Sequence, residues 1–239
     1  IAVHNNHYET IWSWHIWVCN GYNPDATAQV YYNGAGTVMD RNLGATSATK
    51  GDLRAVGLTY QWGRKDPFLN GAINAKSAGT PFDFVPSNMY YGTIDYVVKH
   101  PTIFVNGNNM NHDWYYTGDS STDNTRWNSS KGKYDPCPRG WRVPDGDEEN
   151  GLWAKALGIS TYIMLPWDDI NIGVDLTGLV SDAPEVWYPA TDILGWGRGW
   201  SCTPSYFWAD NYDFRPGASF TPSYASSRSD CLSVRCVKQ

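Results

Sequence analysis

Charged residues are scarce in this 239-residue sequence, and clustered positive charge is missing altogether. Asp, Glu, Lys and Arg make up 18% of the chain, whereas an average soluble domain has about 25%. The 24 acidic residues outnumber the 18 basic ones, giving a net charge of −6. Without a basic patch, the sequence argues against nucleic acid or an anionic membrane surface as a partner. No run of about 20 apolar residues occurs, so we expect no membrane-spanning helix.

The sequence also lacks a recognisable signal peptide and any C-x-x-C pair. Its opening, IAVHNNHYETIWSWHIW, is typical of the middle of a strand, which indicates a piece excised from a longer protein. The cysteines, at positions 19, 137, 202, 231 and 236, do not have the spacing of a zinc knuckle or a thioredoxin-type site. Dispersed cysteines among many aromatic and Asn residues favour an oxidising compartment. We therefore expect a secreted or outer-cell-surface location, with any export signal or anchor upstream of Ile1.

Aromatic residues are abundant, with 13 Trp and 16 Tyr. The length suits one sizeable core, and no internal repeat or low-complexity linker divides the chain, so we expect a single domain over residues 1–239. Helical periodicity is confined to residues 52–62 and 145–157. The second candidate has several acidic side chains in its first turn, where the helix dipole favours negative charge. The pattern predicts an α+β domain with two helices.

The remaining sequence predicts short strands and long loops. Residues 10–18 alternate with apolar side chains on both faces, which predicts a central strand buried on both sides. Other predicted strands are 38–40, 96–98, 102–105 and 233–237. The predicted long loops, rich in Asn, Gly, Asp, Tyr and Pro, are 20–35, 69–95, 106–134 and 166–200. Because these loops contain many aromatic side chains, we expect them to pack against the domain.

Seven segments, spread over nearly the whole chain, share a recognisable pattern. They are WSWHIW (12–17), VMDRNLGATSAT (38–49), GLTYQWGRKDPF (57–68), YDPCPRGWRVP (134–144), VWYPAT (186–191), WSCTP (200–204) and SVRCVK (233–238). In content, order and spacing they resemble the Fibrobacter succinogenes major paralogous domain of Bacteroidales surface proteins.

The resemblance implies a C-type-lectin-like fold with two helices, short antiparallel strands and long packed loops. Similar domains lie at the ends of fimbrillin-like proteins and in lipoproteins. Some are variable proteins of diversity-generating retroelements, in which an error-prone reverse transcriptase rewrites adenine positions near the 3′ end of the gene. The resemblance therefore implies a cell-surface adhesin- or receptor-type domain rather than an enzyme, with a variable segment over residues 196–232.

The resemblance also implies a disulfide between Cys137, in the rigid DPCPRGWRVP corner, and Cys236, in the terminal strand. Such a bridge closes about 100 residues and stabilises the fold by roughly 4–5 kcal/mol in the chain-entropy model. Cys202 and Cys231 depart from the family pattern. They either pair with each other, the alternative we favour slightly, or are independent surface thiols. Cys19 is expected to be unpaired and buried as a small apolar group.

Residues 205–232 have the composition of an antibody-like binding loop, with rigid aromatic residues among small polar ones. By alignment with WSCTP and SVRCVK, the resemblance places variable, ligand-binding positions at Tyr206, Phe207, Asp210, Asn211, Asp213, Arg215, Ser223, Tyr224, Ser226, Ser227, Ser229, Asp230 and Leu232. It assigns the fixed framework between them to Ala209, Tyr212, Phe214, Gly217, Pro222 and Arg228. The segment contains no Lys, Glu, Gln or Met, the residues that adenine mutation of an AAC codon cannot reach. An ordinary hairpin with exposed aromatic side chains is the alternative.

No motif in the sequence indicates catalysis, a metal or a cofactor. The five His residues are scattered, and the acidic residues at 145–149 lack EF-hand spacing, so helix-start acids explain them better than calcium. The EPN or QPD and WND motifs of calcium-dependent lectins are absent. Expected ligands are proteins or glycans on host, bacterial or phage surfaces, and pilin subunits are further candidate partners. Two alternatives stay open: a structural capping or assembly module of a fimbria or lipoprotein and, more remotely, a copper-dependent oxidase related to formylglycine-generating enzymes through Cys202 with Cys231 or Cys236.

Overall fold

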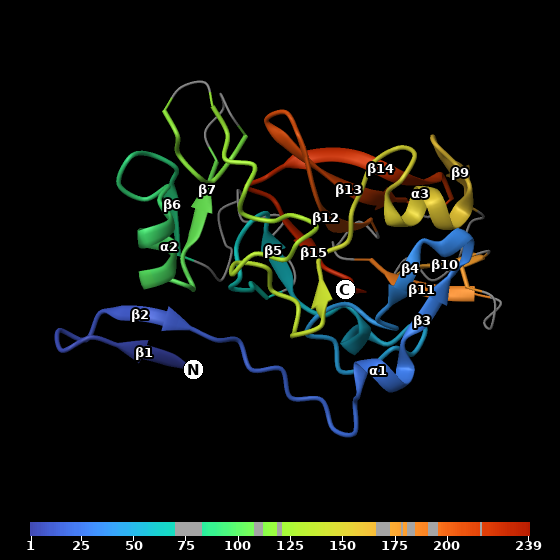
Figure 1. Ribbon diagram of the computed structural model, residues 1–239, viewed down its shortest axis with the longest axis horizontal. Coiled ribbons are helices and arrows are strands. Elements are labelled where there is room, and N and C mark those ends of the chain that lie inside the picture. The colour runs from blue at the N-terminus through green and yellow to red at the C-terminus, as the bar shows by residue number, and fades with distance from the viewer. Residues whose placement is uncertain are drawn as a thin grey trace.

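The computed structural model describes residues 1–69, 83–107, 112–118, 121–165, 173–177, 179–180, 185–190, 196–215 and 217–239. The fold is mixed α+β and consists mostly of short strands with few helices, as the sequence predicts (Figure 1). Within those ranges, no helix has the length and apolar character needed to cross a membrane.

The largest sheet has six strands in the order β5-β15-β12-β13-β14-β9. Their bounds are Thr59–Gln61 (β5), Cys231–Ser233 (β15), Gly197–Ser205 (β12), Trp208–Phe214 (β13), Ser219–Ser227 (β14) and Ile163–Met164 (β9). Strands β12, β13 and β14 are consecutive in the chain and pair antiparallel, forming a meander. This meander contains most of the segment for which the sequence predicts ligand binding.

Smaller elements surround this sheet. A four-stranded sheet has the order β3 (Gln29–Tyr31), β4 (Gly36–Val38), β16 (Val237–Lys238) and β8 (Trp141–Arg142). Two-stranded sheets pair β1 (Ala2–His4) with β2 (Thr10–Ser13), β6 (Phe84–Pro86) with β7 (Phe104–Asn106) and β10 (Gly173–Thr177) with β11 (Glu185–Pro189). The α-helices are α1 (Pro24–Thr27), α2 (Ile94–Lys99) and α3 (Leu152–Leu157), and short 3-10 turns cover Tyr32–Gly34 and Leu53–Ala55.

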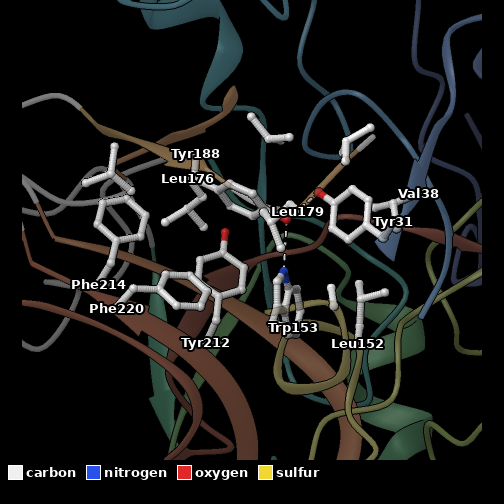
Figure 2. Packing of buried hydrophobic residues seen from close by; sticks show 14 of the residues in the cluster. Tyr31, Val38, Leu152, Trp153, Leu176, Leu179, Tyr188, Tyr212, Phe214 and Phe220 are labelled. Carbon is white, nitrogen blue, oxygen red and sulfur yellow. Dashed lines mark hydrogen bonds between the residues drawn. The ribbon is translucent and has the colours of Figure 1, made fainter. Parts of the chain in front are cut away.

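Aromatic side chains form a core between the meander, α3 and the β10–β11 pair (Figure 2). Tyr212 of β13 meets Trp153 of α3 and Tyr188 of β11 edge-on, with ring centroids 4.7 and 5.1 Å apart. The buried Tyr188 hydroxyl accepts a hydrogen bond from Trp153 Nε1 at 2.9 Å and lies 2.7 Å from the Tyr31 hydroxyl. Tyr31, Trp153 and Tyr188 are thus buried with their polar groups hydrogen-bonded to one another, which lowers the cost of burying those groups in this core.

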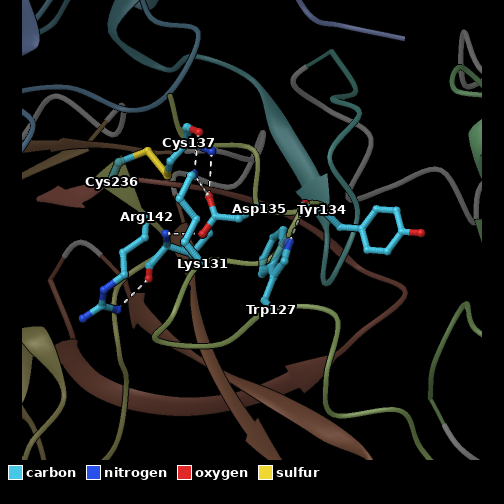
Figure 3. Close-up of a disulfide and its surroundings, with 8 residues drawn as sticks. Trp127, Lys131, Tyr134, Asp135, Cys137, Arg142 and Cys236 are labelled. Atoms are coloured by element: carbon cyan, nitrogen blue, oxygen red, sulfur yellow. Dashed lines mark hydrogen bonds and ion pairs between the residues drawn. A yellow bond between two sulfur atoms is a disulfide. The ribbon is translucent and has the colours of Figure 1, made fainter. Parts of the chain in front are cut away.

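The predicted disulfide between Cys137 and Cys236 is present, with a Cα–Cα distance of 6.0 Å (Figure 3). The corner around Cys137 is held by the Asp135 carboxylate, which accepts hydrogen bonds from the backbone N–H groups of Cys137 and Val143, both at 2.9 Å. Lys131 pairs with the same carboxylate at 2.9 Å. The bridge therefore joins a rigid corner to the strand that ends the chain.

The other cysteines differ from the expectations. Cys202 and Cys231 are separate buried thiols rather than a pair. Cys202 lies 3.3 Å from Asp145 Oδ1, while Cys231 is fully buried in β15. Cys19 is unpaired, as expected, but it is only partly buried, and its sulfur lies 3.7 Å from both the Thr46 carbonyl and Arg41 Nη1.

The predicted central strand over residues 10–18 is wrong. Only Thr10–Ser13 is a strand, and it pairs with β1 in a hairpin that begins an N-terminal arm along one side of the molecule (Figure 1). Ile11, Trp14 and Ile16 are each at least half exposed. The apolar alternation predicts burial on two faces, whereas much of the apolar surface of the arm is exposed, including that of Val18.

Two further predictions also need correction. The expected helix over 52–62 is instead a 3-10 turn followed by strand β5, because Gly57, at φ +74°, interrupts the helix. The expected strand at 96–98 belongs to helix α2, which Thr93 caps by accepting from the N–H of Tyr96. The helix expected over 145–157 is present, but it begins at Leu152. Parts of the predicted loops at 69–95, 106–134 and 166–200 lie outside the described residues.

Candidate functional site

The framework residues expected between the variable positions are mostly buried. Ala209, Tyr212, Phe214, Pro222 and Arg228 are buried and Gly217 is half-buried. On the neighbouring strand β12, a Cβ at Gly199 would lie 2.3 Å from the Tyr212 ring and a Cβ at Gly197 would lie 2.0 Å from the Phe214 ring. The absence of side chains at these two glycines lets the aromatic rings of β13 lie against the backbone of β12.

The buried guanidinium of Arg228 holds the turn between β12 and β13. Its Nε donates to the Trp208 carbonyl at 2.8 Å and its Nη2 donates to the Tyr206 carbonyl at 2.9 Å. Nη2 also donates to Asn124 Oδ1 at 2.6 Å, and the guanidinium carbon lies 4.5 Å from the Trp62 ring centroid. The turn is therefore fixed to the body of the protein through one side chain.

The thirteen predicted ligand-binding positions divide into two sets. The exposed set, whose seven members are exposed or half-buried, is Tyr206, Phe207, Asp210, Arg215, Ser223, Tyr224 and Asp230. The buried set, whose six members are buried, is Asn211, Asp213, Ser226, Ser227, Ser229 and Leu232.

For the buried set, a ligand-contacting role is at odds with the structure. Asn211 Nδ2 donates to the Tyr224 carbonyl at 2.7 Å. Ser227 Oγ donates to the His112 carbonyl at 2.8 Å and lies 2.8 Å from Ser229 Oγ. Leu232 belongs to a second buried apolar cluster, which also contains the disulfide of Cys137 and Cys236. These side chains connect the meander to its surroundings and are not open to a ligand.

The β12–β13 turn presents two aromatic rings of the exposed set to solvent. Tyr206 is 77% exposed and its backbone has a φ of +50°, a left-handed conformation at the tip of the turn. The Phe207 ring lies edge-on to it, with 4.0 Å between centroids. An aromatic pair on an anchored turn, with one ring exposed and the other half-buried, can contribute apolar contact area without much loss of conformational entropy.

A second group of side chains, in which Tyr224 is exposed and Asp213 is buried, lies away from the turn, around Arg198 and Arg215. Arg198 Nε pairs with Asp213 Oδ1 at 2.6 Å, and Arg215 Nε lies 3.7 Å from Asp213 Oδ2. The Arg215 guanidinium lies 4.0 Å from the Trp196 ring centroid, and that of Arg198 lies 5.8 Å from the ring centroid of Tyr224, which is 43% exposed. Arg198 and Trp196 were not among the predicted site residues. They fall within the 196–232 segment, but only the strand register brings them beside Asp213 and Tyr224.

An acidic groove lies on the opposite side of the β13–β14 pair, because successive residues of a strand point to opposite faces. Asp210 and Ser223 line it together with Ser205 and residues 147–150 of the loop before α3, around a volume of about 490 Å³. Burial, followed by repulsion from Asp147 and Glu148, raises the pKa of Asp210 to about 6.

The loop that contains Asp147 and Glu148 is held in shape by the Asp147 side chain. Asp147 Oδ1 accepts from the backbone N–H of Glu149 at 2.8 Å and of Gly151 at 3.1 Å, just before α3 begins. The acids at 145–149 were predicted to lie in the first turn of a helix, but they lie in the loop before α3, whose first turn contains no acidic residue. Among the residues that the structure describes, no group of three or more His, Cys, Asp or Glu side chains is placed to bind a metal ion.

Comparison of the chain with family models, curated proteins and solved structures finds no match to any of them.

Proposed function

We propose that this chain is a cell-surface ligand-binding domain of the adhesin or receptor type, which binds through the exposed set of β12–β14 and the adjoining turn. The C-type-lectin-like fold, the kinship with retroelement-diversified proteins and a place at a fimbrial tip or in a surface lipoprotein are parts of this proposal. The ligand is a protein or glycan of a host, bacterial or phage surface.

The observation that carries the proposal is the division of residues 205–232 into exposed and buried sets. The exposed set combines aromatic rings, an arginine and short polar side chains, a composition typical of adaptable binding surfaces. The buried set and the framework hold those side chains on paired strands, and binding groups on rigid elements lose little entropy on association. Changes at exposed positions therefore leave the scaffold largely intact.

The burial of six predicted positions favours a structural role for those six residues, as in the alternative of a capping or assembly module. A catalytic role has less support. Burial raises the pKa of both the Cys202 and the Cys231 thiols, which keeps them protonated and poorly reactive. We therefore do not propose a copper-dependent oxidase.

The proposal is tested by applying the labelled protein to an array of mammalian and bacterial glycans and to intact bacterial cells. Tyr206→Asn combined with Tyr224→Ser removes two exposed rings, and Asn tolerates the left-handed backbone at position 206. Met89→Ser combined with Tyr90→Ser removes side chains of similar exposure elsewhere. We expect binding to fall at least tenfold in the first double variant and to persist in the second. Equal binding by both would exclude this surface.

A further inference from the structure

A cavity of about 270 Å³ lies between the N-terminal arm and the corner that holds the disulfide. The residues that line it are distant in sequence from those of the proposed ligand-binding surface. The arm contributes Trp12, Trp14, His15 and Trp17 to its walls, and the corner contributes Lys133 and Pro136. Small-ligand sites typically occupy roughly 300–1,000 Å³ and combine apolar walls with a few polar groups. The cavity is thus of a size for one sugar ring or a similar small molecule.

Two of the three tryptophans in the lining, Trp12 and Trp17, are held in place before any ligand arrives. The Trp12 ring lies 4.6 Å from the Lys65 ammonium and 6.1 Å from the Tyr134 ring. Trp17 Nε1 donates to the Ala45 carbonyl at 3.2 Å, and its ring packs on Tyr22 with 5.0 Å between centroids. On the other side, the disulfide and the hydrogen bonds of Asp135 fix the corner (Figure 3). A cavity with fixed walls needs little reorganisation to bind.

Two charged groups in the lining, those of Lys65 and Asp135, already form hydrogen bonds and ion pairs within the protein. The Lys65 ammonium binds Asp66 Oδ1 at 2.6 Å, Ser13 Oγ at 2.6 Å and the Ser13 carbonyl at 2.9 Å, which engages all three of its hydrogens. The Asp135 carboxylate accepts from Lys131 and from two backbone N–H groups. Neither offers net charge to a ligand.

Lys133 differs from these groups. It is exposed, its ammonium lies 4.8 Å from the Tyr134 ring centroid, and it forms no ion pair with any described residue. The exposed imidazole of His15 is a further polar group in the lining. The cavity therefore combines tryptophan faces with a positive charge that no described carboxylate neutralises.

We propose that this cavity binds a carboxylate-bearing monosaccharide unit, such as a hexuronic acid, with its ring against the tryptophans and its carboxylate on Lys133. Indole faces pack against the apolar C–H surface of a sugar ring, while the ammonium supplies a charge-assisted hydrogen bond to the carboxylate. This site is independent of the surface on β12–β14, because no residue is shared between them.

The test is titration of the full chain with methyl β-glucuronide, methyl β-glucoside and acetate, followed by tryptophan fluorescence and calorimetry. We expect the glucuronide to bind at least tenfold more tightly than the glucoside or acetate. Lys133→Gln should weaken glucuronide binding about tenfold or more, because it removes the charge-assisted bond. Lys155→Gln, at an exposed lysine of α3, is the matched control and should bind as wild type.

Trp14→Ala provides a second variant, because Trp14 is half exposed and its bonds to Ile1 are made by the backbone. We expect it to weaken the glucuronide and the glucoside alike, through loss of the stacking surface. The proposal is overturned if the glucuronide does not bind, if acetate or the glucoside binds as tightly, or if Lys133→Gln binds the glucuronide as wild type does.

Discussion

Asp210 lines the acidic groove with its carboxyl partly buried and facing Asp147 and Glu148. Its pKa of about 6 in the folded protein lies above the usual 3.8. The folded state therefore binds this proton more tightly than the unfolded state, and its stability rises as the pH falls through the window from about 6 to 4.

Replacement of Asp210 by Asn should remove this pH dependence. At pH 8 we expect Asp210→Asn to be more stable than wild type by about 1–2 kcal/mol, a shift of two pKa units discounted for partial solvent screening. The difference should shrink towards zero near pH 4. Urea unfolding at the two pH values measures it, and a variant that is less stable than wild type at pH 8 would contradict the assignment.

The residue-level prediction from sequence identified the right segment but not the direction of its side chains. Composition shows that residues 205–232 alternate aromatic and small polar types, yet Asn211 and Ser227 are as polar as Ser223 and are nevertheless buried. The partner of Ser227, the His112 carbonyl, lies 115 residues away in the chain, and that of Asn211, the Tyr224 carbonyl, is set by the pairing of β13 with β14. A pattern within one segment contains no information about such partners.

At the scale of elements, the pairing of β12 with β13 depends on glycines that face aromatic rings. A methyl group at Gly199 would lie 2.3 Å from Tyr212, whose ring is fixed by Trp153 and Tyr188. We expect Gly199→Ala to destabilise the protein by about 1–3 kcal/mol, the usual cost of overpacking a core.

Chemical unfolding of Gly199→Ala and of Gly132→Ala provides the comparison. The Cβ of Gly132→Ala would meet its nearest neighbour at 3.4 Å, an ordinary contact, so a change of less than about 0.5 kcal/mol is expected there. Equal stabilities of the two variants would show that the ring of Tyr212 is not held against β12.

Elements whose signals are local were predicted well, and those that depend on distant contacts were not. The proline-rich corner around Cys137 is present as predicted, whereas the strand predicted over 233–237 is divided between the end of β15 and the start of β16, which belong to different sheets. The arm at residues 10–18 has the alternation of a buried strand, but its strand β2 lies in a two-stranded pair with β1 rather than in a larger sheet of the described residues. Periodicity indicates which residues share a face, whereas neighbouring elements decide whether that face is covered.

At the scale of the whole molecule, the disulfide joins segments 99 residues apart. Replacement of Cys137 and Cys236 together by Ser should lower the free energy of unfolding by about 4–5 kcal/mol, because the unfolded chain regains the entropy of an open loop. Urea unfolding under non-reducing conditions measures the loss. Cys19→Ala, at an unpaired cysteine, serves as the control, and a loss in the double variant no larger than in the control would contradict this role for the bridge.

The central claim is that a fixed framework displays a changeable binding surface, and population sequencing tests it most directly. Codons for residues 196–239 are deep-sequenced across a population of the source organism grown from a single cell. The account predicts substitutions at adenine-bearing codons of the exposed set, with the buried set, the framework and residues 233–238 unchanged. A uniform sequence, or substitutions spread equally over buried and framework positions, would contradict it.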